Sequence, residues 1–239
     1  MSRLLAILLI SGCVSGVAHG QQSTCPETGA RPGDEDTYSQ LSVRLCWQDF
    51  ANGKRHLRIW SPDHSVLLSV DGENAQLYKN GRALGGDFKV GDEEWLWSPD
   101  SRAIILTTHL ANASEEIASV DFIPEVAGMA VIPHPPEDVM KTIQKDFAAR
   151  HRQLKCVGDT NVGGLKWLDR SKKAILIAEI PPSPHCENDD GYFEAYVLSI
   201  PEGRILQRYS MTETVTRFRD VLGPRLVSDV QEQRESHSK

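Results

Sequence analysis

Cysteines are the residues of this chain whose chemistry is most readily inferred. After Cys13, which lies in an N-terminal apolar segment, the chain has four more: Cys25, Cys46, Cys156 and Cys186. An even number of cysteines in an exported chain is typical of disulfides, and four cysteines allow three pairings. We expect the pairing between sequence neighbours, Cys25–Cys46 and Cys156–Cys186. A zinc site is the alternative, and it is disfavoured because the chain has no Cys-x-x-Cys pair.

Two acidic clusters have carboxylates close enough together to suggest a cation site. One is Asp92-Glu93-Glu94, and the other is residues 187–190, which Gly191 follows. Oxygen ligands at short spacing in a glycine-containing loop suit calcium. The second cluster departs from the calcium-loop template, because Cys186 and Val197 occupy its first and twelfth positions. We interpret both clusters as solvated loop charge and expect no metal or cofactor.

Catalytic motifs are missing from the sequence. It contains no Gly-x-Ser-x-Gly elbow, no His-Glu-x-x-His and no phosphate-binding loop. The seven histidines after residue 20 are scattered, and we expect them at surface or edge positions: 56, 64, 109, 134, 151, 185 and 237. A site assembled from distant residues remains the alternative, because catalytic triads are spatial arrangements.

A repeated turn is the most informative pattern. Trp-Ser-Pro-Asp occurs at 60–63 and at 97–100, each time before an apolar run, and a weaker copy begins at Trp167. The tryptophans are 37 and then 70 residues apart, close to one period and two. Proline suits the first central position of a tight turn, and aspartate bonds nearby amides. Each copy therefore predicts two antiparallel strands joined by a turn. The residues expected to build these turns are Trp60, Pro62, Asp63, Trp97, Pro99, Asp100, Trp167 and Asp169.

These residues resemble the WD40-like β-propeller repeat of the periplasmic TolB family, whose hallmark is a Trp/Phe-Ser-Pro-Asp-Gly turn between two strands. The resemblance covers about 59–110 well and 165–209 loosely. It implies a mainly β fold, a propeller-like array of about four to five antiparallel units, open or irregular. The glycine of the hallmark is replaced by His64, Ser101 and Arg170, so we expect these turns to differ from it in detail. The copy between Trp97 and Trp167 is expected near 129–132.

The tryptophans carry a second expectation. If Trp60 and Trp97 occupy equivalent places in neighbouring units, both should be mostly buried, and replacing either by alanine should cost about 3–5 kcal/mol. Trp95 and Trp97 are two residues apart, so strand alternation places both on one face and Leu96 on the other. One of this pair could instead be an exposed contact residue.

The remaining segments set the domain limits. Residues 21–37 are polar and rich in turn formers, typical of a linker. We expect a single β-rich domain over 38–230, with an inserted helix at 136–150, a shorter helix at about 212–222 that Gly223-Pro224 ends, and a disordered tail at 231–239.

The N-terminus is typical of a targeting signal. A basic start, Met1-Ser2-Arg3, precedes seven consecutive apolar residues, Leu4 to Ile10. Seven helical residues rise about 10 Å, far less than a bilayer core of roughly 30 Å, which indicates a signal peptide and not a resident span. Two processing routes stay open: cleavage after residues 1–20, before Gln21, or removal of 1–12 with a lipid anchor on Cys13.

The net charge of the chain limits the classes of partner that it could bind. The net charge is −7, and this acidity argues against nucleic acid, which requires clustered Lys and Arg. Our hypothesis is an exported, non-enzymatic recognition module of the periplasm or outer membrane that binds another envelope or secreted protein. A narrower form of it is an immunity or inhibitor protein. The alternative is a periplasmic hydrolase with a non-local site.

The export hypothesis predicts a processed N-terminus. Intact-mass analysis of the protein from its native envelope should show a chain that starts at Gln21 or one that starts at an acylated Cys13. An unprocessed Met1 in the cytoplasmic fraction would contradict both routes.

Overall fold

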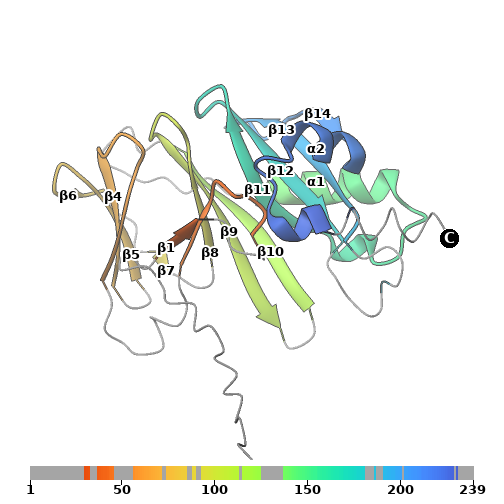
Figure 1. Cartoon of the computed structure of the whole chain (residues 1–239), viewed down its shortest axis with the longest axis horizontal. Coiled ribbons are helices and arrows are strands. Elements are labelled where there is room, and N and C mark those ends of the chain that lie inside the picture. Colours follow the sequence, from red (N-terminus) through yellow and green to blue (C-terminus); the bar gives the residue numbers. More distant parts are fainter. Residues whose placement is uncertain are drawn as a thin grey trace, which may run out of the picture.

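The described part of the chain is mainly β. The computed structural model describes residues 30–32, 37–45, 56–71, 74–84, 88–89, 93–112, 115–124, 137–180, 186, 191–200, 202–228 and 230. They form three antiparallel sheets that lie one after another, with the helices at one end (Figure 1). No helix in these ranges is long and apolar enough to cross a membrane. The N-terminal signal, Cys13, Cys25, Cys46, the copy expected near 129–132 and the predicted tail lie outside the described residues.

The first Trp-Ser-Pro-Asp turn joins the first two strands of the first sheet. Its strands are β3 (His56–Trp60), β4 (Val66–Asp71), β5 (Asn74–Lys79) and β6 (Arg82–Ala83), in that order, with β7 (Phe88–Lys89) also pairing with β5. Asn80 and Gly81 join β5 to β6 with φ of 51° and 75°. Two positive φ values are what a two-residue type I′ hairpin requires, and asparagine and glycine adopt them most easily.

The second and third turns lie in the middle sheet and the last sheet. The middle sheet has the order β1 (Ala30–Pro32), β2 (Val43–Leu45), β8 (Glu93–Trp97), β9 (Ala103–Asn112), β10 (Glu115–Pro124). The last sheet has the order β11 (Asn161–Leu168), β12 (Lys173–Glu179), β13 (Phe193–Ser199), β14 (Ile205–Tyr209). In each of the three sheets, the strands predicted on either side of the turn are present. Strand β1 falls inside the segment 21–37 that was predicted to be a linker.

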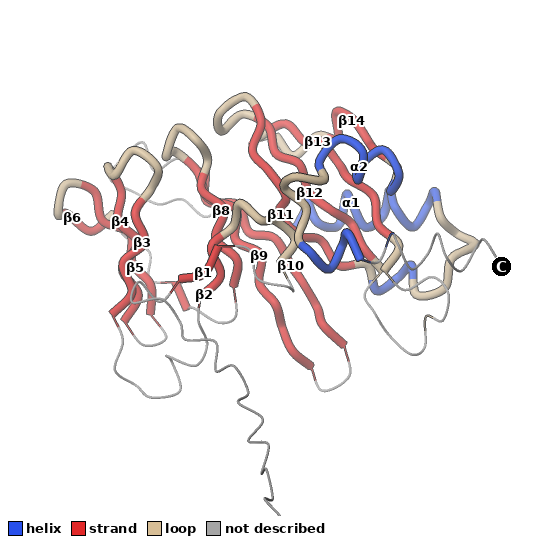
Figure 2. Tube along the Cα trace, viewed as in Figure 1, coloured by secondary structure: helices blue, strands red, loops and turns tan. Residues whose placement is uncertain are grey.

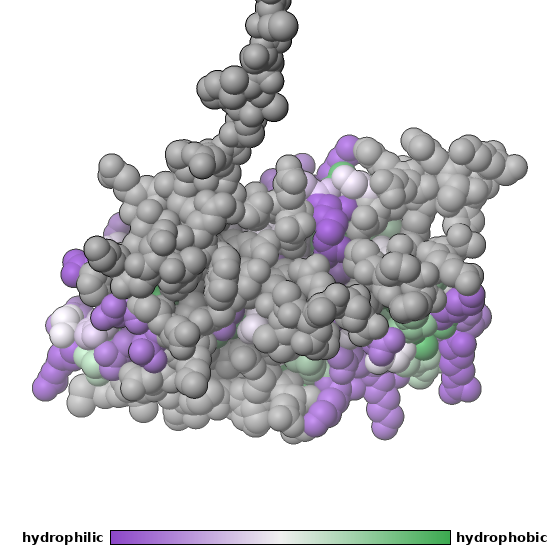
Figure 3. Space-filling model, turned by 90° about the horizontal axis from the view of Figure 1, so that it is seen from below, coloured by the Kyte–Doolittle hydropathy of each residue, from purple (hydrophilic) through white to green (hydrophobic). Residues whose placement is uncertain are grey.

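Three apolar layers hold the sheets together. The first layer joins the first and middle sheets through residues such as Leu68, Leu77 and Ile104. The second joins the middle and last sheets, and the third lies on the outer side of the last sheet. On the face seen in Figure 3, the described residues are mostly hydrophilic, and a hydrophobic area lies at the end of the last sheet. The apolar side chains lie mainly between the sheets.

Both predicted helices are present. Helix α1 (Glu137–Arg150) confirms the helix predicted at 136–150, and its Ile143 and Phe147 are fully buried in the second layer. Helix α2 (Met211–Phe218) begins with a capping box in which Ser210 and Glu213 bond each other's backbone amides. It ends earlier than the predicted 222, and residues 224–228 are helical again, so Gly223-Pro224 does not end the helical structure.

Burial of the tryptophans differs from the expectation in one place. Trp95 is fully buried, Trp97 packs partly buried on the same layer, and Leu96 faces the second layer, which confirms the predicted alternation. Trp167 is buried with 4% of its surface exposed. Trp60, however, is 47% exposed. The prediction that it is buried was wrong, because the first sheet turns Ile59 and not Trp60 towards the middle sheet.

The first acidic cluster is also different from the expectation. Glu93 and Glu94 lie in β8 and are 6% and 1% exposed, so they are not solvated loop charge. The carboxylate of Glu94 accepts hydrogen bonds from the Tyr38 amide at 2.9 Å and from the Ser42 hydroxyl at 2.8 Å. Glu94 therefore fastens the segment before β2 to the middle sheet. The second cluster, 187–190, lies outside the described residues.

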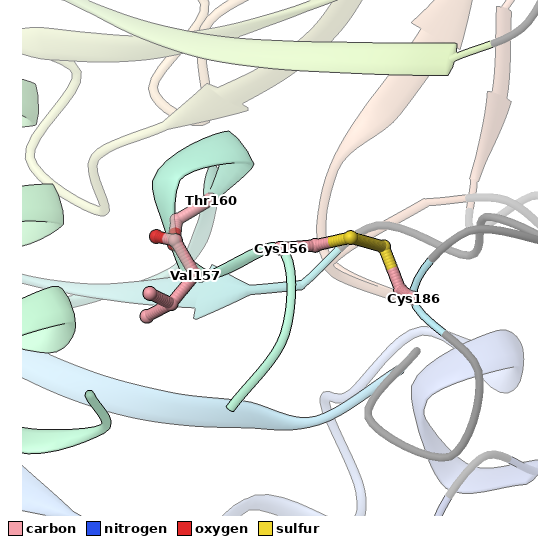
Figure 4. The surroundings of a disulfide bond; sticks show 4 residues. All are labelled: Cys156, Val157, Thr160 and Cys186. Atoms are coloured by element: carbon pink, nitrogen blue, oxygen red, sulfur yellow. A yellow bond between two sulfur atoms is a disulfide. The ribbon is translucent and has the colours of Figure 1, made fainter. Parts of the chain in front are cut away.

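The pair Cys156–Cys186 forms the predicted disulfide, with a Cα–Cα distance of 5.5 Å (Figure 4). Cys156 precedes a short 3-10 helix (Val157–Asp159), and the Thr160 hydroxyl closes this turn by donating to the Val157 carbonyl at 2.7 Å. Both cysteines pack in the second apolar layer. The disulfide thus ties the segment after α1 to the loop that leads into β13.

We predict that the double variant Cys156→Ser/Cys186→Ser is less stable than the wild type by about 3–4 kcal/mol, because the bridge closes a loop of 30 residues in the unfolded chain. Urea unfolding monitored by tryptophan fluorescence measures the difference. Equal stability of the variant and the non-reduced wild type would contradict a structural role for this bridge.

Candidate functional site

The first two turns share one hydrogen-bond pattern around a buried serine. The Ser61 hydroxyl donates to Asp63 Oδ1 at 2.9 Å and accepts from the Val66 amide at 3.0 Å. The Ser98 hydroxyl does the same with Asp100 Oδ1 at 2.8 Å and the Ala103 amide at 2.9 Å. Serine suits this position because its small hydroxyl both donates and accepts.

The residue after the aspartate has a left-handed backbone conformation in the first two turns. His64 and Ser101 have φ of 58° and 57°, in the left-handed region. The first two turns therefore share one backbone conformation. In the third turn the positive φ values are at Asp169 and Arg170, at 50° and 60°. The third turn thus differs from the first two.

Hydrogen bonds also run from each turn to the next. The Asp63 amide donates to the Ser101 hydroxyl at 3.0 Å, and the Ser171 hydroxyl donates to Asp100 Oδ2 at 3.0 Å. Ser101 and Ser171 each lie four residues after a repeat tryptophan, and His64 has this place in the first turn. We call residues 61–65, 98–102 and 169–172 the turn row. Figure 2 shows these turns along one side of the sheets.

These hydrogen bonds act on the two aspartates. The backbone amide and hydroxyl of Ser65, together with the Ser101 hydroxyl, hold the pKa of Asp63 below its ordinary value. Burial alone would raise the pKa of Asp100, but donation from the Ser98 and Ser171 hydroxyls outweighs it and lowers the pKa. Both carboxylates are therefore ionised acceptors within the row at neutral pH.

The middle and last sheets, which carry the second and third turns, approach each other closely. The Trp167 indole N–H donates to the Leu96 carbonyl at 2.9 Å, and the Gly164 amide donates to the Thr107 hydroxyl at 2.9 Å. A Cβ on Gly164 would lie 2.6 Å from a methyl carbon of Ile105, which no side chain tolerates. The middle and last sheets are thus locked together below their turns.

A charged cluster around the buried Glu194 lies away from the turns. The Arg150 guanidinium binds both oxygens of Glu194, at 2.5 and 3.2 Å, and the Tyr192 hydroxyl donates to one of them at 3.3 Å. His151 Nε2 lies 3.0 Å from the same oxygen without hydrogen-bond geometry. Burial, and then the charge of Glu194, raise the pKa of Tyr192 to about 12. His151 is buried here, so the expected surface position was wrong for this histidine.

The residue types in this cluster would suit an acid–base site, but their contacts are those of a structural link between α1 and the last sheet. Both oxygens of Glu194 are engaged by Arg150, which joins α1 to the last sheet. A second pair does the same nearby, because Arg208 of β14 binds both oxygens of Asp146 at 2.7 Å. The sequence analysis missed these pairs. Their only local signal was the spacing of Asp146 and Arg150 on one helical face.

Potential metal ligands do not form a cluster in the described part of the chain. Among the residues that the structure describes, no group of three or more His, Cys, Asp or Glu side chains is placed to hold a metal ion.

Comparisons with known proteins leave the chain without a family. No protein-family profile matches it, and no curated protein matches it. A similar solved structure is the hydrazine synthase of Kuenenia stuttgartiensis, at 12% identity and a TM-score of 0.34, over 79% of this chain. This chain covers 52% of that one, about half its length. A likeness at this TM-score carries no argument about fold or function.

We predict that Ser171→Ala destabilises the protein by about 1 kcal/mol near neutral pH, because Asp100 loses a hydroxyl donor. The loss should depend on pH. Asp100 has a depressed pKa in the folded state, so its contribution is present above its unfolded pKa and disappears as the pH falls through the folded pKa. Urea unfolding across this acid range should show the wild type and variant converging as the pH falls.

The matched control is Ser228→Ala, which removes a hydrogen bond to the Pro224 carbonyl at 3.2 Å and leaves Asp100 and its donors unchanged, so its penalty should not follow the titration of Asp100. A Ser171→Ala penalty that stays constant through the titration of Asp100 would contradict the assignment of this hydrogen bond.

Proposed function

We propose that the protein is an exported, non-enzymatic recognition module of the bacterial envelope, with propeller-like β units, that binds another protein through its turn row. The single observation that carries the proposal is the bonding of each turn to the next, Asp63 to Ser101 and Asp100 to Ser171. These bonds make three separate loops into one rigid surface. Binding residues tend to lie on loops that a rigid scaffold positions.

Support for the propeller-like architecture comes from the order of the sheets. Each sheet contains a strand, a turn and an antiparallel strand, followed by a third strand in sequence order: β3-β4-β5, β8-β9-β10 and β11-β12-β13. The middle sheet also has β1 and β2 beside β8. Successive sheets pack face to face through the apolar layers. Under this proposal each sheet is one unit of the TolB-type repeat, and the array has about four to five units in all.

The exposed atoms of the turn row suit a protein partner. Pro62, Asp63 and Pro99 are exposed at the first two turns, and the exposed Arg102 and Arg170 add positive charge at the second and third turns. Rigid prolines and charges of both signs offer a polar surface with fixed geometry, which favours specific contacts with a folded protein. This surface lacks the clustered positive charge that binding to nucleic acid requires.

Export is supported by the disulfide between Cys156 and Cys186, because such bonds persist in oxidising compartments. Both processing routes fit this compartment, a soluble periplasmic chain or one anchored by lipid at Cys13. The partner would be an envelope or secreted protein. An immunity or inhibitor protein, which neutralises an incoming toxin or hydrolase, is the narrower form of the proposal.

The proposal predicts site-specific crosslinking. A photo-crosslinking amino acid placed at Arg102 or Arg170, in the turn row, should capture the same protein from the native envelope. The same substitution at Arg152, an exposed arginine after α1, is the matched control and should capture it at most weakly.

Equal capture from all three positions, or none from the turn row, would contradict the proposal. Turnover of a cell-wall or ester substrate by the purified chain, abolished by Glu194→Gln but unaffected by turn-row changes, would favour the hydrolase instead.

A further inference from the structure

A short segment before β2, residues 37–42, is bound by three separate parts of the chain, and we call it the strap. The Tyr38 amide donates to the carboxylate of Glu94 in β8 at 2.9 Å. The Ser39 hydroxyl donates to the carbonyl of Leu165 in β11 at 2.7 Å. One bond joins the strap to the middle sheet and the other joins it to the last sheet, so the strap spans the joint between them.

The third part is a C-terminal segment, residues 221–223. The Gln40 amide donates to the Val221 carbonyl at 2.9 Å. In return, the Gly223 amide donates to the Tyr38 carbonyl at 3.0 Å. These two bonds form one antiparallel β-bridge between segments at the two ends of the described domain.

Two glycines make room for the strap. A Cβ on Gly163 of β11 would overlap the ring of Tyr38. A Cβ on Gly223 would overlap the carbonyl group of Thr37. Neither position accepts a larger residue while the strap is in place, so the surface under the strap is shaped to this segment.

Tyr38 anchors the strap. Its side chain is 1% exposed and packs in the third apolar layer with Leu222 and Leu226. The Arg225 guanidinium lies over its ring, 5.6 Å from the centroid, and binds Glu179 of β12 at 2.9 Å. The C-terminal segment thus packs on the strap as well as bonding to it, and neither can leave its place without uncovering the other.

We propose that the strap and residues 221–223 form a clasp that opens and closes as one unit, so that each segment is docked only while the other is. Gln40 and Leu41 are exposed, and the strap lies outside the strands of the middle sheet. It can therefore open without breaking the pairing of a sheet. The proposal does not rest on the turn row or on its partner.

Hydrogen exchange of the purified protein, followed amide by amide, tests the clasp. The amides of Tyr38, Gln40 and Gly223 should share one opening equilibrium and exchange faster than the paired amides of β12. The Gln40 side chain donates to the Leu222 carbonyl at 2.8 Å. Its removal in Gln40→Ala should raise the exchange rates of the Tyr38 and Gly223 amides by the same factor, about fivefold.

The matched control is Gln144→Ala. The Gln144 side chain also donates to a backbone carbonyl, that of Thr160, at 2.8 Å, but it lies on α1. Its replacement should leave the exchange of the Tyr38 and Gly223 amides unchanged.

A double-mutant cycle tests the anchor. Gly163→Ala should displace the Tyr38 ring and raise the exchange rate of the Gly223 amide by about 30-fold. Gly158→Ala should not, because a Cβ there would meet nothing within 4 Å. In a Tyr38→Ala background, Gly163→Ala should have little further effect, because the ring that it displaces is gone. Gln40→Ala carries the test if Gly163→Ala does not fold.

A Gly223 amide whose exchange does not follow that of Tyr38 in Gln40→Ala would overturn the proposal. Exchange of both amides only together with β12 would also overturn it, because the strap would then be part of the sheet core. So would a Gly163→Ala effect that persists in Tyr38→Ala. Turn-row crosslinking is measured separately, so neither proposal falls with the other.

Discussion

A β-strand alternates its side chains between two faces, so a one-residue slip at a turn would send every side chain of the returning strand to the wrong side. In this protein that slip is prevented by the buried serines Ser61 and Ser98. Each hydroxyl holds the aspartate of its own turn and the amide that starts the returning strand. The register that results places Leu68 and Ile104 in the first apolar layer. The packing of the first and middle sheets therefore depends on the register that these two hydroxyls set.

The same turns give the array a direction. Ser101 and Ser171 each reach back to the turn before their own, and Trp97 and Trp167 each face the sheet before their own. An array with a direction has two different ends. Helix α2 covers one of them, and the side of the first sheet that carries Trp60 is exposed at the other. The turn row and the side of the first sheet that carries Trp60 are therefore distinct surfaces that follow from one repeated turn.

Local patterns explain what could be predicted from the sequence. The turns, the strands beside them, helix α1 and the alternation of Trp95, Leu96 and Trp97 all depend on residues within a few positions of one another. The disulfide Cys156–Cys186 followed from an even count and a short separation. None of these required knowledge of how the sheets stack.

The errors at Glu94, His151 and Trp60 concern contacts between distant segments. Glu94 is buried because Tyr38 and Ser42, more than 50 residues before it, supply its hydrogen-bond donors. His151 is buried because α1 docks on the last sheet beside Glu194. Trp60 is exposed because its sheet stands first among the described sheets, whereas its sequence matches that of Trp97. A repeat motif predicts the unit, but it cannot predict which unit lies at the end.

The direction of the array is tested most directly by replacing each repeat tryptophan with alanine and measuring the free energy of unfolding. Trp167→Ala should cost about 3–5 kcal/mol and Trp97→Ala about 3 kcal/mol, because both rings pack against the preceding sheet. Trp60→Ala should cost less than about 1 kcal/mol, as a surface substitution does. A loss for Trp60→Ala equal to that for Trp97→Ala would contradict this account, because Trp60 would then also be packed against a preceding unit.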